Sequence, residues 1–232
     1  MKQQKKMETK AKIDIIRHAR TQWNIEKRIQ GKTDIPLCEA GIRDAVAWAG
    51  QLAGKKYDRI ISSPLIRARE TALKIGAAAG IEVQIVEGIK EQDFGQWEGR
   101  QLAEIRKQSP GEVESRESDG WHFCPPEGES RKKVLARALA SISDMARTNM
   151  GKNVLMVTHS SVIKIIIYHV LGHSFLAGQT SLAGQTSKAG NIIKSWHLHQ
   201  FFWDGHLFLR TLNALDLSSH RTESRKNRLK AE

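Results

Sequence analysis

Cysteine is scarce in this chain, with two residues among 232. Cys38 and Cys124 are far apart and outside any metal-ligand spacing. This pattern favours free thiols in a reducing cytoplasm, although one disulfide between the two residues stays open. We therefore expect a cytoplasmic protein.

Long hydrophobic runs are also missing. The longest apolar stretch, "VIKIIIYHVL", is interrupted by Lys164 and His169 and is too short to span a bilayer. The amino-terminal "MKQQKKMETKAK" has no apolar core, so we expect no signal peptide and no membrane partner.

Negative charge is in short supply, since the formal net charge is +12. Residues 1–12 carry a charge of +4 and residues 218–232 a charge of +3, and neither segment has apolar periodicity. We expect both to be disordered, solubilising tails around one domain at 13–217, and we expect no nucleic-acid partner. The remaining charge of the body is compatible with an anionic small-molecule substrate.

The first half of the chain alternates strand and helix patterns. Short apolar strands are predicted at 13–16, 57–63 and 81–87, with amphipathic helices between them. The helix at 39–54 should bury Ile42, Ala45, Val46, Ala49 and Leu52, and Pro64 should lie in the first turn of the next helix. This rhythm predicts an α/β fold with a mostly parallel central sheet and helices on both faces.

The second half continues the pattern after an irregular excursion at 91–128. A long helix follows from 128, then the apolar strand "NVLMVTH" and another helix. The hexapeptide "LAGQTS" occurs twice in tandem at 176–187, which we interpret as a duplication in a surface loop. Two late segments around "DG" at 204–205 predict a β-hairpin.

Charged side chains and histidines follow the ends of the predicted strands. Because the carboxyl ends of parallel strands meet at one edge of a sheet, these side chains should share a cleft. Arginines bind phosphate oxygens in bidentate fashion, and an imidazole beside them is neutral and nucleophilic near neutral pH. A carboxyl group beside a phosphate can donate a proton to the leaving oxygen. The residues concerned are Arg17, His18, Arg67, Glu91 and His159.

Several motifs together resemble the histidine phosphatase superfamily, which has the phosphoglycerate-mutase-like fold. They occur in the order expected for that family, across 13–213: "RHARTQWN", "RIQGKTDIPLCEAG", "SSPLIRARETA", "EQDFGQWEG", "PPEGES" and "VTHSS". The segment "FCPPEGES" is more similar to the phosphatase branches, including α-ribazole phosphatases and broad-specificity phosphatases, than to the mutase branch.

The resemblance implies a role for each matching residue. His18 would become phosphohistidine, and Glu91 would protonate the leaving group and then activate water. Arg17, Arg67 and His159 would bind and stabilise the phosphoryl oxygens. No metal and no cofactor would be needed. Further contacts to a small phosphate ester would come from Asn24, Gln30 and Ser160.

Four positions depart from the family pattern. Ala19 replaces the usual glycine, and its methyl group would crowd a phosphate bound closely to the backbone. Arg20 would add a positive charge near the mouth of the site. Ser160 and Ser161 replace glycines, and their amides at a helix start can still face an anion.

Two alternatives stay open. One is a mutase of the same superfamily, and the other is a non-catalytic phosphate- or nucleic-acid-binding relative. We expect structural roles for the tryptophans and for Glu98, and at most an adventitious metal site at His197 and His199. The sequence leaves open whether the protein is a monomer or a homodimer.

Overall fold

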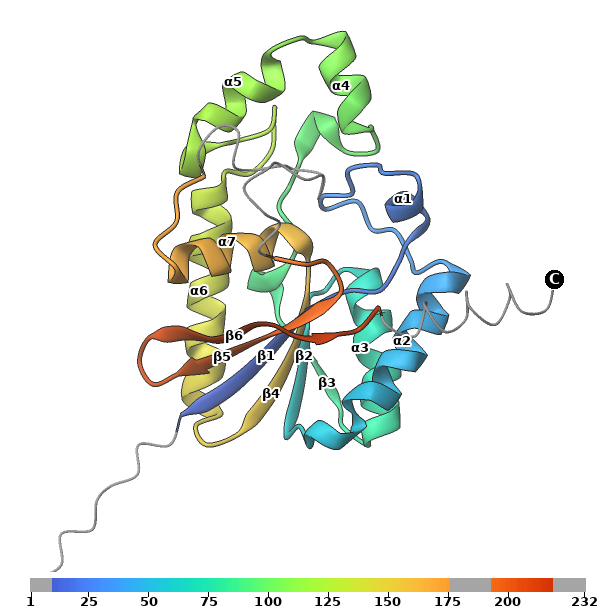
Figure 1. Ribbon diagram of the computed structural model, residues 1–232, viewed down its shortest axis with the longest axis vertical. Coiled ribbons are helices and arrows are strands. Elements are labelled where there is room, and N and C mark those ends of the chain that lie inside the picture. Colours follow the sequence, from blue (N-terminus) through green and yellow to red (C-terminus); the bar gives the residue numbers. More distant parts are fainter. Residues whose placement is uncertain (1–9, 176–192, 219–232) are drawn as a thin grey trace, which may run out of the picture.

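The computed structural model describes residues 10–175 and 193–218. A central sheet lies between two layers of helices, and a smaller helical region extends from one end of this arrangement (Figure 1). Residues 1–9 and 219–232, which belong to the two predicted tails, lie outside the described residues, as does the duplicated hexapeptide at 176–187. Strand β1 begins at Ala11, so residues 11 and 12 belong to the sheet rather than to the amino-terminal tail.

Among the described residues, the sheet has six strands in the order β3-β2-β4-β1-β5-β6. The first four in this order are parallel, and β5 and β6 form an antiparallel hairpin beside β1. This arrangement confirms the predicted mostly parallel sheet and the late hairpin. The strands are β1 (Ala11–Arg17), β2 (Arg59–Ser62), β3 (Val83–Ile85), β4 (Asn153–Thr158), β5 (His197–Trp203) and β6 (Leu207–Asp216).

The helices divide between the two faces of the sheet. On one face α2 and α3 pack against side chains such as Leu155 and Val157. On the other face α6 and α7 pack against Val154 and Met156, the alternate positions of the same strand. The α-helices are α1 (Gln22–Ile25), α2 (Glu39–Leu52), α3 (Ile66–Ala79), α4 (Leu102–Gln108), α5 (Glu112–Ser118), α6 (Arg131–Thr148) and α7 (Ser160–Val170).

The predicted inward face of α2 is partly wrong. Ala45 is fully buried as expected, but Ile42 and Val46 are 40% and 56% exposed. The helix instead turns Trp48 inward, together with Asp44, which is buried and paired with Arg20. Burying the indole removes more apolar surface from water than burying either aliphatic side chain, which explains the rotation.

The start of α3 also differs from the prediction. The helix begins at Ile66 with Leu65 as its N-cap, so Pro64 precedes the helix instead of lying in its first turn. The hydroxyl of Ser63 accepts the amide hydrogen of Leu65 and satisfies a donor at this turn. The helix therefore starts one residue after the Ser63–Leu65 turn closes.

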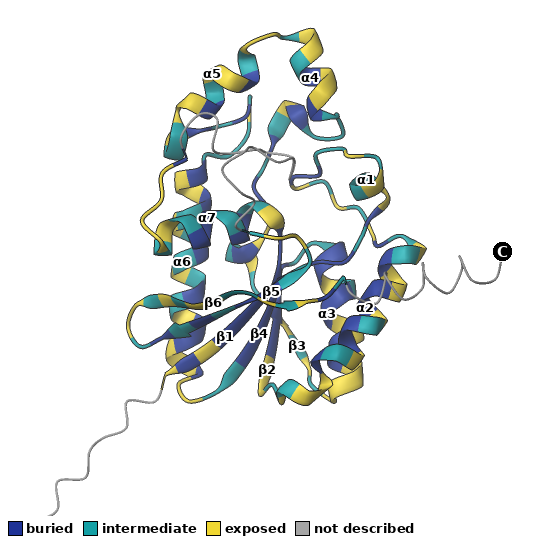
Figure 2. Ribbon diagram, viewed as in Figure 1, coloured by how far each residue is buried: buried dark blue, intermediate teal, exposed yellow. Residues whose placement is uncertain are grey.

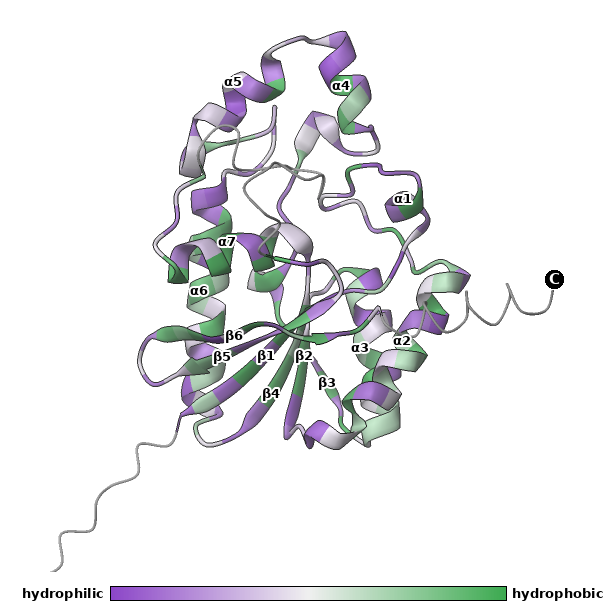
Figure 3. Cartoon of the chain, in the orientation of Figure 1, coloured by the Kyte–Doolittle hydropathy of each residue, from purple (hydrophilic) through white to green (hydrophobic). Residues whose placement is uncertain are grey.

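The excursion at 91–128 folds over the carboxyl-terminal end of the sheet. It contains α4, α5 and the short 3-10 helices η3 (Gly95–Trp97) and η4 (Gly120–His122). It has a small core of its own, in which Trp97 packs on Phe123 with ring centroids 5.9 Å apart. Figure 2 shows much exposed surface on α4 and α5, and Figure 3 shows that α5 is mostly hydrophilic while hydrophobic residues concentrate in the sheet.

Within residues 10–175 and 193–218, no helix combines the length and the apolar character needed to cross a bilayer.

Candidate active site

The two predicted catalytic histidines lie side by side where β1 and β4 end. The amide of His18 donates to the carbonyl of Thr158 at 2.9 Å, which continues the pairing of these strands by one residue. His159 follows Thr158 directly. The two imidazole rings have centroids 5.2 Å apart at an angle of 55°, and both residues are buried. The parallel register therefore places both rings at one edge of the sheet.

A hydrogen bond fixes the tautomer of His18. Nδ1 lies 2.7 Å from the carbonyl oxygen of Ala19, and a carbonyl can only accept, so Nδ1 carries the proton. Burial lowers the pKa of His18 well below its usual value, and the charges of Arg17 and Arg67 lower it further. The ring is therefore neutral near pH 7, with the lone pair on Nε2.

Arg67 is fully buried on the first turn of α3. Its Nη1 and Nη2 donate to the carbonyls of Thr33 and Gly31 at 2.9 and 2.7 Å. Its Nε has no hydrogen-bond partner among the described residues. Burial lowers the pKa of this guanidinium to about 10, so it remains charged at neutral pH.

Arg17 is the last residue of β1 and precedes His18. Its Nε is buried and, within the described part of the chain, has no hydrogen-bond partner. The guanidinium lies over the Trp196 ring, 5.6 Å from the centroid. Burial lowers its pKa, and the nearby Glu91 opposes this effect. A second guanidinium thus stands next to the neutral imidazole.

His159 is held through the side chain of Ser63. Nε2 of the ring lies 2.7 Å from the Ser63 hydroxyl, whereas the buried Nδ1 has no partner in the described ranges. Burial, with Arg67 as the next largest cause, lowers the pKa of His159 well below its usual value. A second neutral imidazole therefore leaves one ring nitrogen available to a ligand.

Glu91 lies between the 3-10 helices η2 (Glu87–Ile89) and η3, with 8% of its surface exposed. Its Oε1 accepts the amide hydrogen of Gln92 at 2.9 Å, and its Oε2 is 3.4 Å from the amide of Ser161. The amide of Ser161 at the start of α7 thus contacts Glu91, while the neighbouring Ser160, predicted as a substrate contact, is exposed.

The predicted substrate contacts Gln30 and Asn24 differ in whether their side-chain oxygen already has a partner. Gln30 is buried, and its Oε1 has no partner among the residues described. The Oδ1 of Asn24 instead accepts the amide hydrogen of Thr21 at 3.0 Å and closes a capping box at the start of α1. The structure thus leaves the carbonyl oxygen of Gln30 available, while that of Asn24 has a local structural partner.

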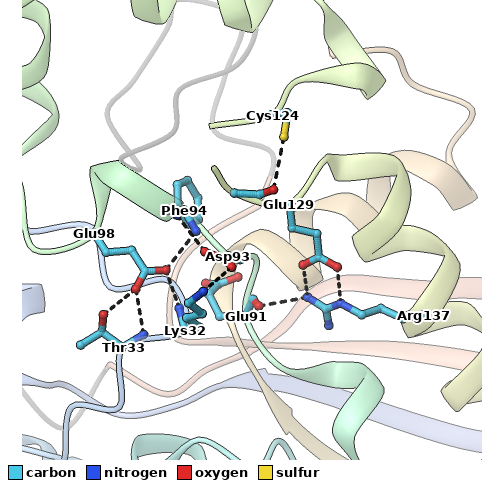
Figure 4. A network of polar contacts seen from close by, with 11 residues as sticks. Lys32, Thr33, Glu91, Asp93, Phe94, Glu98, Cys124, Glu129 and Arg137 are labelled. Atoms are coloured by element: carbon cyan, nitrogen blue, oxygen red, sulfur yellow. Dashed lines mark hydrogen bonds and ion pairs between the residues drawn. The ribbon is translucent and has the colours of Figure 1, made fainter. Parts of the chain in front are cut away.

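Glu98 organises the loop that holds Arg67. Its carboxylate accepts the amide hydrogens of Lys32 and Thr33 at 2.9 and 3.1 Å, and that of Phe94 at 3.0 Å (Figure 4). Gly31 has a φ of +54°, and an added Cβ there would collide with Glu98. The loop is therefore tied to the excursion.

A family model, described as histidine phosphatase superfamily (branch 1), matches residues 13–187. The chain belongs to the histidine phosphatase superfamily. The matched range includes every predicted site residue.

Relatives in this superfamily carry different names. Glucosyl-3-phosphoglycerate phosphatase of Mycobacterium tuberculosis is 32% identical over 161 residues, which are 66% of this chain and 71% of the relative. A probable phosphoglycerate mutase of Salmonella arizonae is 29% identical over 160 residues, covering 69% and 74%.

Solved structures of superfamily members share the fold. The crystal structure of a phosphoserine phosphatase mutant from Entamoeba histolytica, in complex with phosphoserine, has a TM-score of 0.71 at 31% identity. The match covers 88% of this chain and 97% of that one. A structure of mycobacterial glucosyl-3-phosphoglycerate phosphatase gives a TM-score of 0.72 at 26% identity, with 88% and 99% coverage.

Two of the residues that depart from the superfamily pattern have structural partners. Ala19 is fully buried in the core on the α2–α3 face, and its amide donates to the Thr71 hydroxyl at 3.0 Å, so its methyl group packs inward. Arg20 forms a two-pronged ion pair with Asp44, with distances of 2.6 and 2.9 Å. Its charge is therefore compensated by α2.

The late histidines have structural surroundings. Nδ1 of His199 accepts the amide hydrogen of Asn213 at 3.3 Å, and burial lowers the pKa of His199 to about 4. Nε2 of His197 lies 3.7 Å from a carboxylate oxygen of Asp216. Within the described ranges, no group of three His, Cys, Asp or Glu side chains is arranged to hold a metal ion.

Three residues that orient the site were not predicted from the sequence. Ser63 binds the ring of His159, Thr71 binds the amide of Ala19, and Arg137 binds the backbone around Glu91. Ser63 lies in the "SSPLIRARETA" motif, but the motif does not indicate that its hydroxyl contacts a histidine. Nothing in the sequence near Arg137 distinguishes it from other helical arginines.

Proposed function

We propose that this protein is a phosphatase that hydrolyses a small phosphate monoester through a phosphohistidine on His18. Nε2 of His18 attacks phosphorus while the bond to the leaving oxygen breaks and Glu91 gives that oxygen a proton. Glu91 then takes a proton from water, the water oxygen attacks phosphorus, and the phosphorus–nitrogen bond breaks. Inorganic phosphate leaves, and both residues return to their starting states.

The observation that carries this proposal is the state of His18. An imidazole that donates from Nδ1 and stays neutral at pH 7 presents a nucleophilic lone pair on Nε2. The protein maintains this state beside two guanidinium groups, Arg17 and Arg67, which attract a dianionic phosphoryl group and stabilise its charge during transfer. A purely structural histidine would not need such neighbours.

Buried polar atoms without partners support phosphate binding at the same place. Nε of Arg17, Nε of Arg67 and Nδ1 of His159 are unsatisfied among the described residues, and each such atom is costly unless a ligand completes it. We assign a proton to Nδ1 of His159, with the Ser63 hydroxyl donating to Nε2. The three atoms are then donors suited to phosphoryl oxygens.

Further substrate contacts would come from the edge of the site. The buried amide of Gln30 can bind a substrate group, and reversing its orientation would turn its NH₂ toward a phosphoryl oxygen. Asn24 keeps an NH₂ group, and Ser160 offers a hydroxyl and an amide at the start of α7. We retain all three as proposed substrate contacts.

A mutase activity is the alternative that one observation favours, since a relative is named as a probable phosphoglycerate mutase. A mutase would return the phosphoryl group from His18 to a second hydroxyl of the bound product instead of to water. The segment 123–130 is more similar to phosphatase branches, which is why we favour hydrolysis. A coupled assay with phosphoglycerate and a bisphosphoglycerate primer separates the two.

A panel of phosphate esters tests the proposed function. Wild type should release phosphate from at least one ester in the presence of a metal chelator, because protein groups supply the electrostatic stabilisation. His18→Ala should lose at least about a thousandfold in kcat/KM. Equal rates for the two proteins would overturn the proposal. Cytoplasmic location remains a prediction from the two free cysteines, and monomer and homodimer both remain open.

A further inference from the structure

Glu91 reaches the site from a segment without regular secondary structure. Among the described residues, its carboxylate has two hydrogen-bond partners, and both are backbone amides, those of Gln92 and Ser161. Side-chain hydrogen bonds therefore do not fix this carboxyl group. Its position depends on how firmly the backbone at 88–92 is held.

One side chain on α6 holds that backbone. The guanidinium of Arg137 donates from Nη1 to the carbonyls of Gly88 and Lys90 at 2.8 and 2.6 Å. Nη2 donates to the carbonyl of Glu91 itself at 3.0 Å (Figure 4). Gly88 packs so closely on α6 that an added Cβ would collide with Ser141 and with the backbone of Arg137. The Glu91 segment is thus fastened directly to the helix.

The orientation of Arg137 is set by a second residue. Nε and Nη2 both donate to the carboxylate of Glu129 at 2.8 Å, in a bidentate pair whose side chains are 18% and 19% exposed. The backbone of Glu129 extends the clamp, because its carbonyl accepts from Gln92 Nε2 at 2.7 Å and its amide donates to Asp93. A planar guanidinium can make all these bonds at once, whereas a lysine ammonium cannot.

We propose that Arg137, oriented by Glu129, is a positioning residue that holds the carboxyl group of Glu91 against the leaving oxygen of the substrate. The inference rests on the proposed function, in which Glu91 protonates that oxygen. Arg137 touches backbone carbonyls around Glu91 and acts through them. Its loss should impair proton donation more than substrate binding, because a small displacement of a catalytic group strongly lowers the rate.

Leaving-group dependence tests this role. The experiment compares 4-nitrophenyl phosphate with phenyl phosphate, which has nearly the same shape but a poorer leaving group that needs the proton more. Arg137→Met should lower kcat/KM for phenyl phosphate by about ten- to a hundredfold, and that for 4-nitrophenyl phosphate by less than about threefold. Arg137→Lys keeps the positive charge and should show the same selectivity to a smaller degree, which covers the case in which Arg137→Met does not fold.

Two further variants complete the design. Arg147→Met removes an exposed arginine of the same helix that forms a solvent-exposed ion pair with Asp144, and should leave both rates within about twofold. Glu91→Gln removes the proposed proton donor itself and should lower kcat/KM for phenyl phosphate selectively, by more than the Arg137 variants do. If Glu91→Gln lowers both rates equally, proton donation by Glu91 fails and the proposed function must change. If Glu91→Gln is selective while the folded Arg137 variants lower both rates equally or not at all, the positioning role alone is overturned.

Discussion

Asp14 on strand β1 and His18 directly after the end of that strand are two buried polar side chains four residues apart, and their surroundings differ. The carboxylate of Asp14 accepts the Tyr57 hydroxyl at 2.8 Å and Gln200 Nε2 at 3.0 Å, with Lys55 Nζ at 3.5 Å. His18 lies near buried donor atoms of Arg67 and His159 that have no partner in the described part of the chain.

The contrast separates a structural polar cluster from a functional one. Buried polar groups in folded proteins normally have hydrogen-bond partners, because each unsatisfied group costs free energy. The Asp14 cluster follows this rule within the protein. In the described part of the chain, the cluster around His18 contains buried nitrogen atoms without a partner, which is the arrangement expected if a phosphoryl group completes the hydrogen bonding.

The largest predicted effect comes from substituting His18 and Asp14 separately and comparing activity with stability. His18→Asn should lower kcat/KM at least about a thousandfold while the free energy of unfolding stays within about 1 kcal/mol. Asp14→Asn should do the reverse, lowering the free energy of unfolding by about 1–3 kcal/mol and kcat/KM by no more than about twofold. Enzyme kinetics and urea unfolding on both variants give the answer. A folded Asp14→Asn protein without activity would contradict the separation.

A smaller effect is expected at Ser63, which orients His159. Ser63→Ala removes the partner of Nε2 and frees the ring to adopt the tautomer that accepts at Nδ1, so kcat/KM should fall by about ten- to a hundredfold. Ser62→Ala is the matched control, because the one partner of that buried hydroxyl among the described residues is the carbonyl of Ser63. Similar kinetic losses in the two variants would show that the hydroxyl contact to His159 has no special role.

The smallest effect concerns pH and stability. His18, His159 and His199 have lowered pKa values and are neutral in the folded state. Below the unfolded-state pKa of about 6.5, the unfolded chain binds protons that the folded chain does not, so stability falls as pH decreases. For His199, with a folded pKa of about 4, the loss from pH 7 to pH 5 should be about 2 kcal/mol.

Urea unfolding at pH 7 and pH 5 measures this loss in the free energy of unfolding. His199→Gln should reduce the pH dependence of the free energy of unfolding by that amount. If the free energy of unfolding changes with pH as much in His199→Gln as in wild type, this ring takes up its proton in the folded state.

The sequence predicts the parts of the site that follow from topology. Arg17, His18 and His159 could be placed together because parallel strands bring their carboxyl ends to one edge. The face of α2 could not be deduced from the aliphatic spacing alone, since the burial of Trp48 decides the rotation of that helix.

Sequence patterns could not predict the contacts through which Ser63 and Arg137 orient the site. Ser63 and His159 are 96 residues apart, and Arg137 is 46 residues from Glu91. Their contacts depend on rotamers and on how α6 packs against an irregular segment. No local periodicity encodes that packing.

Trapping the covalent intermediate tests the central claim most directly. Wild type mixed with a ³²P-labelled ester and quenched in base within the first turnover should carry label that is stable to base and labile to acid, as expected of a phosphohistidine. Peptide mapping should place the label on His18, and His18→Asn should carry none. Steady hydrolysis by wild type with no acid-labile label at any quench time, or label that persists in His18→Asn, would contradict the account.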